Sequence, residues 1–428
     1  MILTGQVSGI WIEDKLNALA QATQKDGEIW RAAYTDEDKI AKKMLAQWMR
    51  EAGLYVREDA VGNLLGRLEG ETDETILVGS HLDTVKNGGK YDGACGVISA
   101  LAAVKKLIKR GIKVKKSIEV VALVEEEGSR YEIGYVGSRA MIGALTQDDL
   151  KETDTDGISL SKAMENAGYD PRLIHEAARS DIAAYIELHI EQGPVLDLSN
   201  AKVGIVENIT GLFSWMIEIK GTQNHAGTTP MAVRKDPVCV AAQFICDLTE
   251  QAKLISNTAT VTVGKIQAFP GVSNVIADRV QLTVDIRDAY KEKLLEIDLY
   301  LTNALKAIET HGFTVCAKNM CREMPAKLDT DLTEMLADTS NKIGLEFIRM
   351  NSGAGHDAQL FAEKFPACMI FIPSRDGISH SPLEYTSVEA LDDGLKLLEK
   401  VLLGLAVGWE NVCKHQATDH CHNISPIT

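Results

Sequence analysis

Hydrophobic and polar residues follow two periods along this chain, and together they predict alternating helices and strands. Ile40, Met44, Leu45 and Trp48 recur at helical spacing, which predicts an amphipathic helix over residues 36–53. Strand, helix, strand order with polar groups at the strand ends is typical of α/β proteins. The further elements expected in this part are a hairpin at 54–70, buried strands at 74–81, 117–129 and 183–193, and a helix at 98–112.

A different order of elements follows in residues 212–321. It predicts strand, helix, two strands, helix and strand, the β-α-β-β-α-β order of a ferredoxin-like unit. The chain then returns to α/β material, with helices at 330–344 and 390–410 around a strand at 366–374. We therefore expect a catalytic domain in two parts, residues 1–211 and 322–428, with an inserted domain at 212–321.

Composition and charge narrow the class of protein. Hydrophobic residues make up 45% of 428 residues, enough for a large core. The net charge of −16 lacks the basic footprint of a nucleic-acid-binding protein. We find neither an apolar run of membrane-spanning length nor a signal peptide. The eight scattered cysteines predict reduced thiols in a cytoplasmic protein. The Cys- and His-rich segment 413–422 matches no zinc module, so we expect a frayed tail.

The polar residues at the strand ends carry the candidate chemistry. His81, His189 and His380 each come at or after the end of a predicted strand, and Asp92 and Glu127 follow two of these strands. Singly, each has an ordinary interpretation as part of a surface turn or a solvated strand end. Parallel strands bring such ends together, however, and adjacent carboxylates near a core need a cation. Five nitrogen and oxygen ligands suit two divalent ions bridged by one carboxylate.

Several motifs, in one order from about residue 30 to residue 400, resemble those of the hydantoinase/carbamoylase-type dimetal amidohydrolases, a group related to the aminoacylases and the glutamate-releasing carboxypeptidases. The motifs are "GSHLDTVKNGGKYDG", "EEEGSR", "ELHIEQG", "NHAGTTPMAVRKD", "FPGVSNVIADRVQLTVDIRD", "SGAGHDAQ" and "DGISHSPLE". The resemblance implies a mixed-sheet, dimetal peptidase-like catalytic domain with an inserted ferredoxin-like α+β lid. It also implies a homodimer formed through that lid, and a small carboxylate as substrate.

The resemblance also implies a role for each candidate residue. Asp92 would bridge the two ions and Glu126 would be the general base, while Asp83 would receive the other ring N–H of His81. His225 would stabilise the oxyanion, often in a neighbouring subunit's site. The terminal metal ligands would be His81, His189, Glu127 and His380, and the substrate contacts Gln192, Asn274, Arg287, Gly355 and His356, with Asn274 and Arg287 gripping the α-carboxylate. Zn²⁺, Mn²⁺, Co²⁺ and Ni²⁺ all suit such ligands.

One departure bears on the substrate. Allantoate-specific members of the group have "GQRRY" where this chain has "GLFSW", residues 211–215, so their second Arg falls on Ser214. With Phe213 and Trp215 alongside, we expect an apolar pocket and therefore an N-carbamoyl-L-amino acid substrate, hydrolysed to the amino acid, CO₂ and NH₃. Allantoate or another ureido acid is the alternative. A non-catalytic binding protein of the same fold is a third, against which the complete ligand set argues.

Overall fold

The computed structural model describes residues 7–408, and its contacts divide the chain into two compact units. Of the described residues, the first unit comprises 7–207, 327–350 and 356–408, and the second comprises Asn208–Ala326 and Asn351–Gly355. The Cys- and His-rich tail at 413–422 lies outside the described residues. Within residues 7–408, none of the helices combines the length and the apolar character that a membrane crossing requires.

A nine-stranded mixed sheet forms the frame of the first unit, in the order β15-β8-β17-β7-β5-β6-β4-β3, with β16 paired to β8. The four strands in its middle, β17, β7, β5 and β6, run parallel, and β8 and β4 flank them antiparallel. The predicted mixed α/β architecture is thus observed. The strands are β3 (Tyr55–Glu58), β4 (Leu64–Leu68), β5 (Thr72–His81), β6 (Lys116–Leu123), β7 (Ile182–Ile190), β8 (Val203–Ile209), β15 (Ala326–Lys327), β16 (Phe347–Ser352) and β17 (Ala367–Ile372).

Helices cover both faces of this sheet. Alternate residues of β5, such as Ile76 and Val78, pack into the main core with residues of α1, α2, α3, α9 and α11. A smaller core on α4 and α5 includes Val124 and Tyr131. Burial on both faces explains why the parallel strands read as continuous apolar runs. The helices are α1 (Gly9–Thr23), α2 (Asp36–Ala52), α3 (Ala94–Lys109), α4 (Val136–Ile142), α5 (Leu160–Ala167), α6 (Val195–Ser199), α9 (Thr330–Ile343), α10 (Asp357–Phe361) and α11 (Val388–Val407).

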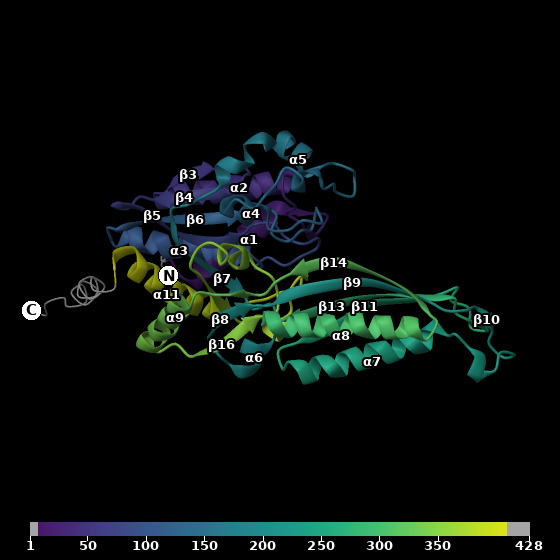
Figure 1. The fold of residues 1–428 in the computed structure, drawn as a ribbon. Coiled ribbons are helices and arrows are strands. Elements are labelled where there is room, and N and C mark those ends of the chain that lie inside the picture. The colour runs from purple at the N-terminus through teal and green to yellow at the C-terminus, as the bar shows by residue number, and fades with distance from the viewer. Residues whose placement is uncertain (1–6, 409–428) are drawn as a thin grey trace, which may run out of the picture. The chain divides into compact units, whose positions relative to one another are not determined.

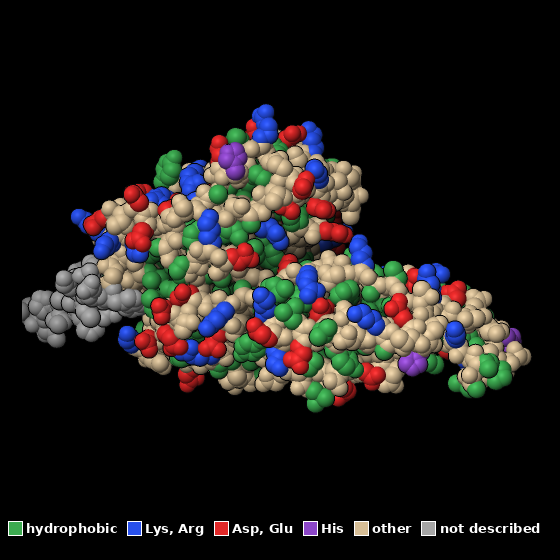
Figure 2. Space-filling model, in the orientation of Figure 1, with side chains coloured by type: hydrophobic (Ala, Val, Ile, Leu, Met, Phe, Trp, Pro, Cys, Tyr) green, Lys and Arg blue, Asp and Glu red, His purple; other side chains and the backbone are tan. Residues whose placement is uncertain are grey.

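The second unit is a four-stranded antiparallel sheet in the order β11-β13-β9-β14, with α7 and α8 side by side along one face (Figure 1). The four strands of this sheet and the two helices follow one another along the chain in the order β-α-β-β-α-β. Acidic, basic and hydrophobic side chains are interspersed over the part of this unit that Figure 2 shows. The elements are β9 (Gly211–Lys220), β10 (Asn224–His225), α7 (Pro237–Ile255), β11 (Thr260–Phe269), β12 (Val275–Ile276), β13 (Arg279–Asp288), α8 (Lys291–Thr310) and β14 (Thr314–Glu323).

Local sequence explains where the elements next to the chemistry begin and end. The predicted helix at 36–53 is α2, which Thr35 caps by accepting a hydrogen bond from the main-chain N–H of Asp38. Gly53 ends α2 with a left-handed φ of 96°. Helix α3 begins at Ala94, earlier than the predicted residue 98. Asp92 therefore lies immediately before the first turn of a helix, in a short and constrained segment.

Candidate metal centre

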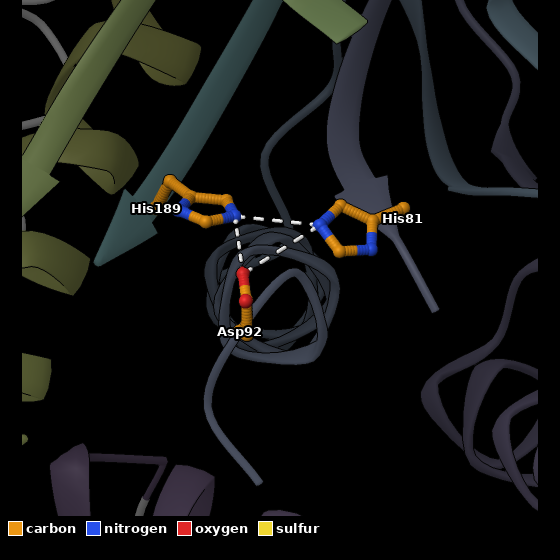
Figure 3. Close-up of side chains that lie close together, drawn as sticks. All are labelled: His81, Asp92 and His189. Carbon is orange, nitrogen blue, oxygen red and sulfur yellow. Dashed lines mark hydrogen bonds and ion pairs between the residues drawn. The ribbon is translucent and has the colours of Figure 1, made fainter. Parts of the chain in front are cut away.

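Three buried side chains meet at the carboxyl edge of two adjacent parallel strands. His81 is the last residue of β5, His189 lies near the end of β7, and Asp92 reaches up from the segment before α3 (Figure 3). Asp92 Oδ1 lies 3.1 Å from His189 Nε2 and 3.7 Å from His81 Nε2, and the two Nε2 atoms are 3.5 Å apart. One ligand atom from each residue therefore faces a common point, as a metal site requires.

The other oxygen of Asp92 faces a second group. Asp92 Oδ2 lies 3.1 Å from His380 Nε2, which in turn lies 3.4 Å from Glu127 Oε2. Asp92, Glu127 and His380 also offer ligand atoms within 4.8 Å of one another. Because the two carboxylate oxygens of Asp92 face two different groups, this side chain has the geometry of a bridge.

The ring orientations fit metal ligation. The Nδ1 atoms of His81 and His189 lie 3.1 Å and 2.8 Å from the main-chain carbonyl oxygens of Asp83 and Ile190. A carbonyl only accepts, so each Nδ1 carries the proton that it donates, and each Nε2 is left for a ligand. Glu127 Oε1 is buried and has no hydrogen-bond partner among the described residues. The donor set therefore fits divalent cations.

The electrostatics of the site also point to a cation. Burial raises the pKa values of Glu126 and Glu127 well above their usual range, and neighbouring carboxylates add to the effect. Burial alone would lower the pKa of His189, but its hydrogen bond to Asp92 raises it to about 9. A divalent cation at this point would allow the buried carboxyl groups to ionise.

Asp83 does not hold His81 in the predicted way. The His81 ring reaches the main-chain oxygen of Asp83, and its Nδ1 is 3.8 Å from the Asp83 carboxylate, too far for a hydrogen bond. The carboxylate instead accepts two main-chain hydrogen bonds, Oδ1 from the N–H of Glu126 at 3.2 Å and Oδ2 from that of Glu127 at 3.1 Å. Asp83 therefore positions the turn that carries both glutamates, a contact with no local sequence signal.

The three consecutive glutamates divide into different environments. Glu126 Oε2 lies 3.8 Å from His81 Nε2, beside the first ligand group. Glu125 points away from it, and its Oε1 accepts hydrogen bonds from the main-chain N–H groups of Arg130 and Tyr131. Glu125 adopts a left-handed φ of 51°. Such backbone costs about 1–3 kcal/mol in a non-glycine residue and is common at functional sites. The turn thus directs Glu125 towards the loop at Arg130 and Tyr131, and it directs Glu126 and Glu127 towards the two groups of candidate metal ligands.

Two of the predicted substrate residues lie against the ligand groups. Gln192 Nε2 is 3.2 Å from Asp92 Oδ2 and 3.3 Å from His380 Nε2. His356 is buried against the His189 ring, with the two ring centroids 4.6 Å apart. Together with Glu187 and His189 it forms a third group with closely spaced ligand atoms. Gly355 belongs to the second unit.

The second unit separates Asn274 from Arg287, so the predicted pair does not form within one chain. Asn274 accepts a main-chain hydrogen bond from Ala226, next to His225 in the β10–β12 pair at one end of the unit (Figure 1). Arg287 lies at the far end of β13 from that pair, roughly 27 Å along a strand that rises about 3.4 Å per residue. Its guanidinium bonds to both oxygens of Asp285 and to the carbonyl of Gly353.

The structure also corrects the expectation that residues 211–215 form an apolar substrate pocket. Phe213 is fully buried in the core of the second unit, beneath α7 and α8, and Trp215 packs against the same core. The Trp215 indole N–H donates to Asp298 of α8 at 2.9 Å. Ser214 lies on the opposite face of the sheet and pairs with Asp285, the residue that holds Arg287. Alternation along β9 therefore puts both aromatic rings into the unit's own core.

Two buried carboxyl groups to which the sequence analysis assigned no role lie beside the first unit's site. Glu384 accepts main-chain hydrogen bonds from Tyr91 and Asp92. Glu187 accepts hydrogen bonds from the Ser80 hydroxyl and the main-chain N–H of Ala358. Glu187 lies in a predicted strand and Glu384 ends the motif "DGISHSPLE". The partners of both residues are nevertheless distant in sequence.

Comparison with known proteins agrees with this geometry. Residues 77–404 match peptidase family M20/M25/M40, and the chain belongs to this metal-dependent family. It is 41% identical to an allantoate amidohydrolase of Bacillus subtilis, over 92% of this chain and 97% of that protein. It is 40% identical to an N-carbamoyl-L-amino acid amidohydrolase of Geobacillus stearothermophilus, over 90% and 95%.

A solved structure is similar over the same length. It is a hydantoinase/carbamoylase-family amidase from Burkholderia multivorans, with a TM-score of 0.88 and 31% identity over 94% of this chain and 98% of that one. The predicted resemblance is therefore confirmed. The protein is a hydrolase of carbon–nitrogen bonds other than peptide bonds, as predicted.

Proposed function

We propose that this protein hydrolyses N-carbamoyl-L-amino acids to the amino acid, CO₂ and NH₃, using two divalent ions in each subunit. The observation that carries the proposal is the arrangement around Asp92, whose two oxygens face separate ligand groups while Glu126 lies beside one of them. Zn²⁺, Mn²⁺, Co²⁺ and Ni²⁺ are the candidate ions. The relatives named as N-carbamoyl-L-amino acid amidohydrolases support the substrate class.

The ions would be held by His81 and His189 on one side and by Glu127 and His380 on the other, with Asp92 between them. Bound there, they would polarise the carbamoyl carbonyl and make a water molecule more acidic. Glu126 would take a proton from the attacking water and deliver it to the amino-acid nitrogen as the C–N bond breaks. The products of that step are the amino acid and carbamate, which decomposes to CO₂ and NH₃.

The hydrogen bonds of the His225 ring leave its Nε2 as a hydrogen-bond donor. Its Nδ1 accepts hydrogen bonds from the main-chain N–H groups of Gly227 at 3.0 Å and Thr228 at 3.2 Å. An Nδ1 that accepts leaves the proton of a neutral ring on Nε2. His225 is exposed, so this N–H is available to an oxyanion from another part of the assembly.

We further propose that the second unit, the inserted domain predicted at 212–321, is a lid and dimerisation module. The separation of His225 and Asn274 from Arg287 within one chain supports this, because a substrate of amino-acid size cannot span roughly 27 Å of strand. In a homodimer, the His225 end of one subunit would complete the site of its partner. Arg287, oriented by Asp285 and Gly353, would bind the substrate carboxylate.

A mixed dimer tests this arrangement. We would combine a His225→Ala chain with a Glu126→Gln chain, each inactive alone. If His225 acts across the dimer, one of the two sites in a mixed dimer has both groups intact, and activity returns towards half of the wild-type value. Mixed dimers confirmed by native mass spectrometry that remain inactive would contradict the arrangement.

Allantoate is the second candidate substrate, and two observations favour it. The allantoate amidohydrolase relative is as similar to this chain as the carbamoylase is. Because Phe213 is buried in the second unit's core and Trp215 packs against that core, the aromatic pocket that had favoured a hydrophobic amino acid does not form. Ser214, on the sheet face that carries Arg287, remains the difference that favours the carbamoyl substrate, because it provides no second cation for a ureido arm.

Steady-state kinetics on the metal-loaded enzyme would decide between these substrates. We expect kcat/KM for N-carbamoyl-L-amino acids to exceed that for allantoate and for N-acetyl amino acids. The Ser214→Arg variant should shift this ratio towards allantoate, and Ser214→Lys is the matched control for a charge without a planar fork. A wild-type preference for allantoate would make this protein an allantoate amidohydrolase. Two bound ions by metal analysis with no turnover of any of these substrates would favour the non-catalytic alternative.

The described cysteines, all free thiols, support a cytoplasmic location within this proposal.

A further inference from the structure

The segment after His380 returns beneath the turn that carries Asp92. Glu384, at the end of this segment, is 5% exposed. Its Oε1 accepts hydrogen bonds from the main-chain N–H groups of Tyr91 at 2.8 Å and Asp92 at 3.1 Å. Its Oε2 accepts one from the Ser379 hydroxyl at 3.0 Å. One carboxylate therefore holds the main chain of the Asp92 turn and the side chain next to His380.

Gly89 shows how closely this carboxylate fits. A Cβ atom at Gly89 would lie 2.1 Å from Glu384 Oε1 and 2.2 Å from its carboxyl carbon. The backbone of Gly89 is not among those with a left-handed φ. Glycine is thus required at this position for space rather than for conformation, and the space is filled by Glu384.

We propose that Glu384 is a positioning residue, which sets Asp92 between the two ligand groups and joins the Asp92 turn to the His380 segment. This inference rests on the proposed metal site and adds a residue to it. Asp92 and His380 come from opposite ends of the first unit's sequence, and their approach at 3.1 Å depends on contacts between the two segments. Glu384 supplies two such contacts through Oε1, while its Oε2 accepts a hydrogen bond from Ser379, next to His380.

The hydrogen-bond pattern predicts that shape, rather than charge, matters at this position. Both main-chain N–H groups donate to the same oxygen of Glu384, and the Ser379 hydroxyl meets the other. A glutamine can keep its amide oxygen towards the two N–H groups and donate from its NH₂ to the Ser379 oxygen. An alanine can do neither, and it leaves two buried N–H groups without an acceptor.

Calorimetric titration of the metal-free protein with Mn²⁺ or Zn²⁺ tests the proposal without requiring turnover. For Glu384→Ala we expect metal affinity to fall about 10- to 100-fold, the usual cost of losing a group that orients a ligand. Glu384→Gln should stay within about threefold of wild type by the same scale, and so should Glu389→Ala, an exposed glutamate nearby. Thermal unfolding without metal would show that each variant is folded.

A double-mutant cycle with Gly89 gives a second measurement. Gly89→Ala should weaken metal binding on its own, because the new methyl group displaces the Glu384 carboxylate. In a Glu384→Gly background the same change should have little further effect, because the carboxyl group and the Cβ atom that a methyl group at residue 89 would meet are then both absent. Independent, additive losses would overturn the proposal, as would wild-type affinity in Glu384→Ala or a Glu384→Gln variant as weak as alanine.

The outcomes also separate this proposal from the proposed function. Wild-type protein that binds two ions but turns over none of the tested substrates would contradict the substrate assignment. The role of Glu384 in metal binding would still be decided by the titration. Wild-type protein that binds no divalent ion would overturn both.

Discussion

Replacing Asp83 by asparagine would separate its two possible roles. The carboxylate accepts one main-chain hydrogen bond on each oxygen, from Glu126 on Oδ1 and from Glu127 on Oδ2. Asparagine has a single acceptor oxygen, so one of these buried N–H groups would face an NH₂ group. Glu384 differs, because its two main-chain partners share one oxygen. We therefore expect Asp83→Asn to be harmful and Glu384→Gln to be tolerated.

The magnitude follows from the lost contact. A buried donor left without an acceptor costs about 1–3 kcal/mol. In a unit of about 300 residues each kcal/mol lowers Tm by about 1.5–2 °C, so metal-free Asp83→Asn should unfold a few degrees below wild type. The turn that carries Glu126 would shift with it. A misplaced catalytic group costs kcat by as much as about a hundredfold.

The assay compares thermal unfolding of the metal-free protein with kcat of the metal-loaded enzyme at pH 8. Burial raises the pKa of Asp83 to about 6, so its carboxylate is ionised under these conditions. If Asp83 instead acted through a carboxylate contact to His81, the remaining asparagine oxygen would keep that contact. An Asp83→Asn enzyme with wild-type Tm and kcat would therefore refute the role assigned to the two main-chain hydrogen bonds.

Three further predictions concern the site. Glu126→Gln should lower kcat at least about a hundredfold with both metals retained, checked by single-turnover kinetics and metal analysis. Arg287→Ala should raise KM about 10- to 150-fold for carboxylate substrates, the value of a charge-assisted hydrogen bond, and change turnover of a carbamoyl amine far less. The stability that metal adds should grow from pH 5.5 to 8. Burial raises the folded-state pKa values of Glu126 and Glu127 above 4.5, so the metal-free fold binds extra protons and loses stability as pH rises, whereas metal binding requires the ionised groups. Equal Tm gains across that range would contradict this.

The type of most elements could be predicted because it depends on local periodicity. Continuous apolar runs became the parallel strands β5, β6, β7 and β17, and helical spacing became α2 and α11. Elements with weaker patterns, such as α1 and β16, were not predicted. Strand ends with His and Asp residues also predicted the candidate ligands, because adjacent parallel strands end at the same edge of a sheet.

The contacts that orient those ligands could not be predicted in the same way. Glu384 holds the N–H of Tyr91 across a sequence separation of 293 residues, and no local pattern reports such a contact. Period-two alternation in β9 puts Phe213 and Ser214 on opposite faces, but it does not say which face α7 and α8 cover. That choice decided which side chain shares a surface with Arg287.

The sequence by itself thus determined the kinds of element, the ligand types and their places at strand ends, because spacing and side-chain chemistry are local properties. Tertiary structure alone decided that Asp83 reaches His81 through its main chain and that Asn274 lies far from Arg287. Those outcomes depend on loop paths and strand register. Each arises from packing between segments remote in sequence, whose energies add up only once the whole fold has formed.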